Sequence, residues 1–144
     1  MAHNLTRWDS IAEGRVSFPV NETMGFELQP ADAPHETISY TWTIPEAYSN
    51  SEGNLQGGIM AAFIDAVLGT VTTPHLPEDK YPTLAEMKVS FFRPAKVGST
   101  ITGTGRVVKR GRRVLFAEVE VTGEDDKLLA KASGTEIPSD VTKR

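Results

Sequence analysis

The chain has 144 residues, a formal net charge of −4 and no cysteine. This length fits one domain with a single core, and the missing thiols exclude disulfides, metal–thiolate sites and cysteine nucleophiles. The mild acidity gives no reason to expect nucleic acid or an anionic membrane as a partner. Three scattered histidines lack the spacing of a zinc site, so no metal is expected.

The N-terminal region is expected to be short and simple in structure. Its first ten residues lack the apolar segment of a secretory signal, which makes a cytoplasmic protein the expectation. Residues 5–16 are compatible with a short helix that has Trp8 and Ile11 on one face and ends at Gly14. A strand is expected from Met24 to Leu28.

Residues 36–44 alternate in the pattern of a half-buried strand. Polar residues occupy one face, and the other face carries Ile38, Tyr40, Trp42 and Ile44. Pro45 ends this strand, and residues 46–57 are expected to form the loop that leads to a helix.

An almost wholly apolar helix is expected within residues 50–73, after an Asn- and Gly-rich loop. Asp65 is its only acid, and no other formal charge occurs between Glu52 and Glu78. The apolar run is about 14 residues, which is shorter than the ~20 needed to cross a bilayer. Because a helix that is apolar on all sides is a buried helix, the rest of the chain is expected to wrap it.

Residues 75–82 are expected to be loop, because prolines and charges dominate them. The remainder has the alternation of strands, with hairpin turns at 109–112 and 123–126 that imply antiparallel pairing. The expected strands are residues 84–92, 99–109, 113–122 and a weaker one at 127–136, and the tail after Ile137 is expected to fray. Gly103 and Gly105 fall on one face of the second of these strands, where they indicate a bulge or a close approach by the helix.

These elements predict an α+β fold in which a curved antiparallel sheet of about six strands wraps one long buried helix. The whole chain, 1–144, is expected to be one domain. Its core covers about residues 20–137, and residues 1–19 form an extension.

The helix carries two features that suit catalysis. Its first turn, at Gln56, Gly57 and Gly58, offers unpaired backbone N–H groups with a partial positive charge, which suits a developing oxyanion. Asp65 lies eight residues after Gly57, roughly 12 Å along the axis, too far for both to act on one carbonyl. If both serve one site, two copies of the helix must meet.

The layout and three motifs resemble the hotdog-fold acyl-CoA thioesterases of the PaaI-like branch. The motifs are the N-x5-Q-G-G-x6-D arrangement at 50–65, FFRPAKVG at 91–98 and RGRRVLFAEVEV at 110–121. The resemblance implies thioester hydrolysis at a homodimer interface, and it implies that two such dimers form a homotetramer. Coenzyme A then enters as part of the substrate, and no separate cofactor is implied.

The resemblance also implies roles for five residues. It makes Asn50 the loop side chain that contacts the thioester or water, Gly57 the carbonyl-polarising N–H and Asp65 the acid from the neighbouring subunit. Gln56 stands where the family commonly has His, and it donates a hydrogen bond but carries no proton at neutral pH. Thr83 is the nearest match to a hydroxyl residue that assists the acid.

Each of these residues also has a purely structural interpretation. Asn50 can hold its loop, Gln56 can cap the helix, and Gly57 can serve close packing. Asp65 differs from them, because an unpaired buried carboxylate destabilises a fold and so favours function or an ion pair across an interface.

A basic cluster at 109–113 stands out in this acidic chain. It is either a solvated hairpin tip or, together with Arg93 and Lys96, a holder of the coenzyme A phosphates, for which the forked guanidinium is suited. The candidates for phosphate contacts are Arg93, Arg110, Arg112 and Arg113.

Functions of three different classes are compatible with the predicted fold. The first is an acyl-CoA thioesterase that uses Asp65 as general base or as nucleophile. A hydroxyacyl-thioester dehydratase is disfavoured, because neither His35 nor His75 lies in the loop or the helix. The alternative that stays open is a non-catalytic acyl-CoA-binding or sensing protein. The sequence does not select the acyl group.

Overall fold

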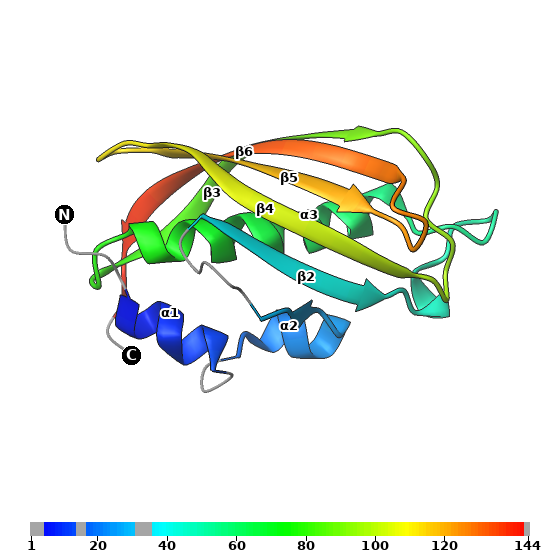
Figure 1. Ribbon diagram of the computed structural model, residues 1–144, viewed down its shortest axis with the longest axis horizontal. Helices are drawn as coiled ribbons and strands as arrows, with labels where there is room; N and C mark the ends of the chain where they lie inside the picture. Colours follow the sequence, from blue (N-terminus) through cyan, green and yellow to red (C-terminus); the bar gives the residue numbers. More distant parts are fainter. Residues whose placement is uncertain (1–4, 14–16, 31–35, 143–144) are drawn as a thin grey trace.

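The computed structural model describes residues 5–13, 17–30 and 36–142, with side chains from Asp9 onward. Six strands and one long helix dominate it (Figure 1). The helices are α1 Leu5–Ala12, α2 Pro19–Met24 and α3 Gly57–Thr72, with single 3-10 turns η1 Glu46–Tyr48 and η2 Thr73–His75. The strands are β1 Glu27–Leu28, β2 Thr37–Thr43, β3 Lys80–Phe91, β4 Thr100–Arg110, β5 Leu115–Thr122 and β6 Leu128–Asp140.

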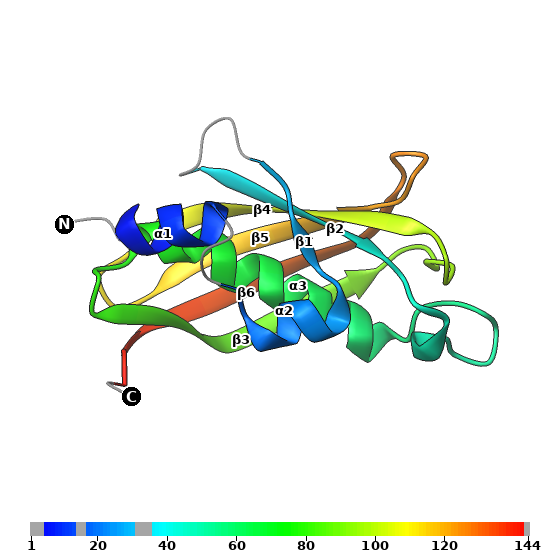
Figure 2. The ribbon, with the colours of Figure 1, turned by 90° about the horizontal axis from the view of Figure 1, so that it is seen from below.

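The strands form one antiparallel sheet in the order β1-β2-β4-β5-β6-β3. Seen from the side, the sheet curves over α3, and α1 and α2 lie on the other side of that helix (Figure 1). The view from below confirms this order of layers (Figure 2). The predicted fold, a curved antiparallel sheet wrapped around one long helix, is confirmed.

Glycines let α3 approach the sheet closely. A Cβ added at Gly103 would lie 2.8 Å from the Phe63 ring, and one at Gly105 would lie 2.8 Å from Val67 Cγ1. Both distances are shorter than real Cβ contacts. The predicted close approach of the helix at these two glycines is therefore confirmed.

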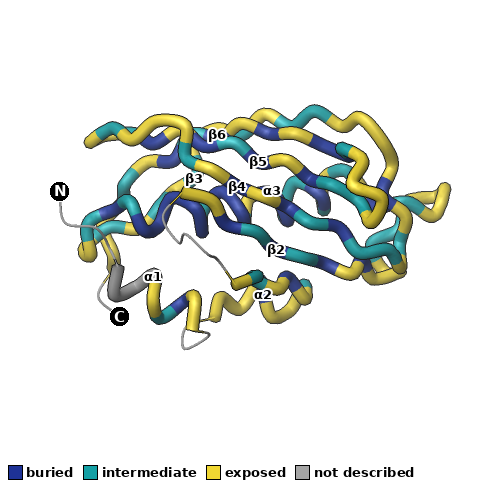
Figure 3. Tube along the Cα trace, in the orientation of Figure 1, coloured by how far each residue is buried: buried dark blue, intermediate teal, exposed yellow. Residues whose placement is uncertain are grey.

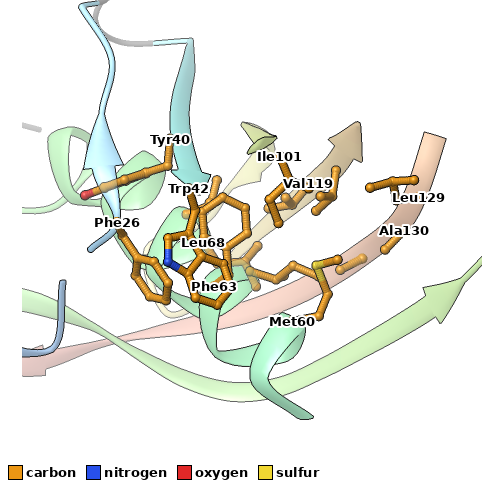
Figure 4. Packing of buried hydrophobic residues seen from close by; sticks show 14 of the residues in the cluster. Phe26, Tyr40, Trp42, Met60, Phe63, Leu68, Ile101, Val119, Leu129 and Ala130 are labelled. Atoms are coloured by element: carbon orange, nitrogen blue, oxygen red, sulfur yellow. The ribbon is translucent and has the colours of Figure 1, made fainter. Parts of the chain in front are cut away.

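The core lies between α3 and the concave face of the sheet. Phe63 packs edge-on against Phe26 and is stacked with Trp42, with ring centroids 5.2 and 5.7 Å apart (Figure 4). The Trp42 indole N–H donates to the Met24 carbonyl at 2.7 Å, which ties the start of the chain to β2. The predicted buried face of 36–44 is confirmed. Figure 3 shows buried residues, in dark blue, alternating with more exposed residues along the strands.

The N-terminal elements match the prediction in part. A helix forms at Leu5–Ala12, but Gly14 and the side chain of Trp8 lie outside the described residues. The strand expected from Met24 to Leu28 forms only at its end, as β1, and its predicted start is wrong, because residues 19–24 form α2. Pro19 in the first turn and Gly25 in the left-handed conformation at the end, with φ of 81°, favour this short helix.

Two further boundaries differ from the sequence prediction. β3 begins at Lys80 inside the predicted loop, and β6 continues to Asp140 where fraying was expected. The two segments pair with each other, with Pro82 opposite Pro138. Pro82 lacks a backbone N–H, and it is tolerated because β3 is an edge strand, where that N–H would point to the unpaired side.

The helix is not buried all round, which corrects another expectation. Its large side chains face the sheet, whereas the opposite face carries an exposed Asp65 among small residues that are only partly covered. Next to this face runs the outer edge of β3, a strand of 12 residues that has a neighbour on one side only. Long unpaired edges are ready templates for another strand.

Gly134→Ala tests the close packing of α3 on the sheet. An added Cβ would lie 2.6 Å from Leu68 Cδ1, so the helix must shift or Leu68 must leave its rotamer. We expect a loss of about 1–3 kcal/mol in the free energy of unfolding, measured by urea denaturation. Gly58→Ala is the matched control, because nothing lies within 4 Å of its added Cβ. Equal stability of the two variants would contradict this packing account.

Candidate active site

Asp65 opens onto a cleft of about 710 Å³. Ala62, Ala66 and Gly69 of α3 form one wall with it, and Tyr81 and Pro82 of β3 stand beside them. The other walls come from the N-terminal region and the C-terminal end, namely Ile11, Phe18, Val20, Asn21, Val141 and Thr142. Partial burial raises the pKa of the Asp65 carboxyl above its ordinary value of 3.8, which makes it a stronger base.

Gly57 lines a different cleft, about 380 Å³ in volume, at the start of α3. Asn50, Phe91 and Arg93 line it too. Asp65 and Gly57 therefore face separate clefts of one chain, as expected from their spacing along the helix.

Asn50 holds its loop through its acceptor atom. Its Oδ1 accepts hydrogen bonds from the backbone N–H of Glu52 at 2.9 Å and of Asn54 at 3.1 Å. The side-chain amide keeps its N–H₂ group to donate to a molecule in the Gly57 cleft. The structural and the functional interpretations of Asn50 are thus compatible.

Gln56 precedes α3 in an extended conformation and is exposed. Its side chain does not cap the helix, but its backbone carbonyl accepts from the N–H of Ile59 at 2.9 Å and of Met60 at 3.1 Å. The side-chain amide is therefore available to a ligand at the helix start.

Thr83 does not line the Asp65 cleft. Its hydroxyl donates to Ser139 Oγ at 2.7 Å, and the residue opposite it on β6 is the exposed Ile137. Leu84, the next residue, packs against the core. Thr83 therefore lies on the face of β3 away from α3 of its own chain, and its catalytic role stays a prediction.

The basic candidates separate into two groups. Arg93 lines the Gly57 cleft, where its guanidinium donates to the Leu128 carbonyl at 2.8 Å. Arg110, Arg112 and Arg113 are exposed on the β4–β5 hairpin, and Arg110 Nη1 lies 3.3 Å from Nδ1 of His75, just after the C-terminal end of α3. One chain therefore places these groups at opposite ends of α3.

A second acid, Glu136, was missed from the sequence. It is 1% exposed, on the core face of β6 with Ala132 and Gly134. Burial, followed by the negative charge of Asp65, raises its pKa to about 7. The alternation of small residues in 130–136 places Glu136 on the buried face, and this signal could have found it.

Metal ligands do not gather in the described part of the chain, where no three His, Asp or Glu side chains form a group that could hold an ion. The segment Gly57–His75 is long and apolar enough to cross a membrane by composition, but 56% of it is buried inside the fold. It is the core helix of this domain.

The family model of the thioesterase superfamily matches residues 52–130. The chain belongs to the thioesterase superfamily. The matched residues run from the loop before α3 into β6, so they include Gln56, Gly57 and Asp65. The predicted family and the predicted enzyme class, a thioester hydrolase, are confirmed.

Named relatives and solved structures agree with this thioesterase assignment. Mouse acyl-coenzyme A thioesterase 13 is 28% identical over 104 residues, which cover 72% of this chain and 74% of that protein. A medium/long-chain acyl-CoA thioesterase of Salmonella typhimurium is 26% identical over a match that covers 81% of this chain and 83% of that protein.

A phenylacetic acid degradation-related protein of Ralstonia eutropha superposes with a TM-score of 0.82 at 27% identity, over 90% of this chain and 98% of that one. The Escherichia coli PaaI protein has the same TM-score at 17% identity, over 94% of each chain, which supports the fold.

Proposed function

We propose that this thioesterase hydrolyses acyl-CoA thioesters at sites shared by two chains, with Asp65 as the catalytic acid. The observation that carries the proposal is the separation of Gly57 and Asp65 into two clefts along one rigid helix. Each cleft holds half of the groups that the reaction needs.

The free edge of β3 and the partly covered face of α3 beside it support a two-fold homodimer. Two β3 edges that pair antiparallel would continue the sheet from one chain to the next. Two antiparallel α3 helices would then place Gly57 of one chain near the partner subunit's Asp65. Ala62 and Ala66 line the Asp65 cleft, and their small side chains leave room in it beside the carboxyl. Pairing of such dimers into a tetramer is proposed from the family resemblance.

The proposed chemistry combines the residues of the Gly57 cleft with those of the Asp65 cleft. The helix-start N–H of Gly57, with the amides of Gln56 and Asn50, would donate to the thioester oxygen as negative charge develops on it. Ionised Asp65 takes a proton from water as the water oxygen attacks the carbonyl carbon. The tetrahedral intermediate then breaks its C–S bond, and the thiolate leaves and takes up the proton. As a nucleophile, Asp65 would instead attack the carbonyl carbon and expel the thiolate, which forms a mixed anhydride that water cleaves.

The Asp65 cleft is proposed to receive the acyl group. It begins at the carboxyl that acts on the carbonyl, and most of its lining is apolar. Ile11 and Val20 of the N-terminal region form its far wall, so this region takes part in acyl selection. The polar residues Asn21 and Thr70 also line it, and both bond to the Tyr40 hydroxyl, at 3.2 and 3.0 Å.

Two solved structures of the same fold support coenzyme A as the thiol part of the thioester substrate. A Streptococcus mutans protein is bound to acetyl CoA, with a TM-score of 0.72 at 21% identity. A Streptococcus pneumoniae protein contains coenzyme A, with a TM-score of 0.71 at 18% identity. In this chain, Arg93 and the hairpin arginines Arg110, Arg112 and Arg113 are proposed to contact its phosphates. A non-catalytic acyl-CoA-binding role is disfavoured by the membership in an enzyme family.

Asp65→Asn tests the acid directly. The amide keeps the shape and the hydrogen bonding but cannot accept a proton, so kcat should fall by about 10²–10⁴. Thiol release from a panel of acyl-CoAs measures this. A folded Asp65→Asn protein with near-normal turnover would remove Asp65 from the mechanism.

Replacing Arg110 and Arg112 with Ala tests the coenzyme A contacts. If they hold phosphates, KM should rise for an acyl-CoA but hardly change for the matching acyl-pantetheine, which lacks the nucleotide. The matched control is Arg106→Ala. Arg106 lies on β4, as Arg110 does, but its guanidinium is paired with Glu118 at 2.7 Å. The same change in KM for both substrates would mean that the cluster only shapes the surface.

A further inference from the structure

Glu136 is a buried acid that the mechanism proposed above does not use. It is 1% exposed, and neither of its carboxylate oxygens has a hydrogen-bond partner among the residues that the structure describes. An unpaired carboxyl in a core destabilises the fold, and a well-packed apolar side chain at the same place would not. The acid is therefore poorly explained by packing alone.

Two contacts fix how α3 lies along β3. A Cβ added at Gly57 would lie 3.4 Å from the Phe91 ring, and one added at Gly69 would lie 4.0 Å from Pro82. The start of the helix thus lies at the end of the strand, and the end of the helix lies near the start of the strand. The two elements run antiparallel.

This alignment brings the two acids to one level of the fold. Asp65 precedes Gly69 by one turn, roughly 6 Å along the helix axis. Two strand residues span about the same length, which places Asp65 near Leu84, whereas eight helix residues counted from Gly57 place it near Met87. Asp65 therefore lies level with the segment between Leu84 and Met87. Leu84 pairs with Glu136 on β6. Because the side chain of Glu136 is on the core face, it points to the side of the sheet on which α3 packs.

We propose that Glu136 is a second acid of the active site, a positioning residue that faces α3 near the level of Asp65 and acts on thioester hydrolysis through it. This inference rests on the function proposed above, in which Asp65 is the catalytic acid.

The groups around Glu136 leave Asp65 as its electrostatic partner. Its neighbours across the sheet, Leu84 of β3 and Leu115 of β5, are apolar. Arg110 lies one strand further, opposite Leu115, where it contacts His75. Glu86 of β3 is exposed. Burial and the charge of Asp65 are the two causes that raise the pKa of Glu136 to about 7.

Two carboxyls of this kind titrate as a coupled pair. While Glu136 is neutral, Asp65 alone carries negative charge. Once Glu136 ionises, the second negative charge makes Asp65 bind a proton more strongly, which strengthens it as a base. We therefore expect kcat/KM to rise with pH as Glu136 loses its proton.

The test compares pH profiles of kcat/KM for wild type, Glu136→Gln and a control, Glu120→Gln. Glu120 is exposed and lies 3.4 Å from Lys131, so its loss should leave the profile unchanged. The wild type should show a rise of about threefold centred near pH 7. Glu136→Gln should match the wild type at lower pH and lack this rise. A wild-type profile that is flat or falls there, or a rise that persists in Glu136→Gln, overturns the inference.

A second measurement needs neither activity nor the Glu136 variant. Carboxyl ¹³C titration by NMR reports the pKa of Glu136 in the wild type and in Asp65→Asn. Removal of the neighbouring charge should lower the pKa of Glu136 in the variant. An unchanged pKa would show that the two acids are not coupled. Full turnover by Asp65→Asn would instead refute the proposed function, whatever the pKa of Glu136.

Discussion

The close packing of α3 on the sheet is the constraint on which the rest of the structure depends. Three strand glycines, Gly103, Gly105 and Gly134, leave room for Phe63, Val67 and Leu68 at distances that a Cβ would not permit. A helix held this closely cannot bend or slide, so the positions of Gly57 and Asp65 along it are fixed. The same contact leaves the opposite face of α3, with its one acid, lining a cleft that the N-terminal region covers only in part.

The sequence predicted most of this arrangement, because periodicity records which face of an element is buried. The alternation of Ile38, Tyr40 and Trp42 and the glycines opposite the helix both had direct structural counterparts. The misses arose where tertiary pairing overrides local signals. Lys80 and Pro82 resemble a loop, but pairing with the end of β6 makes them strand. The six residues of α2 are too few for a periodic pattern, so only the flanking Pro19 and Gly25 signalled the helix.

The candidate site was predicted unevenly for a physical reason. Asp65 stands out because it is the only charge in an apolar helix. Glu136 lies in a strand whose other face is polar, so its charge is not conspicuous in the sequence. Its burial raises its pKa from an ordinary 4.5 to about 7, so the folded state binds the proton more tightly than the unfolded state does. The associated stability is present at low pH and is lost as pH rises towards 7, a change of about 3 kcal/mol. An acid at this position destabilises the fold at neutral pH, as expected of a functional group rather than a packing residue.

The central claim is that one reaction centre takes Gly57 from one chain and Asp65 from another. Mixing two inactive variants tests it most directly. An excess of Asp65→Asn is combined with Gly57→Val, whose side chain would crowd Phe91 and the helix start, and subunit exchange is followed by mass spectrometry. Hybrid dimers contain one site that is wild type at both positions, so thiol release from acyl-CoA should reappear as hybrids form. Hybrids that form and stay inactive would contradict the shared site.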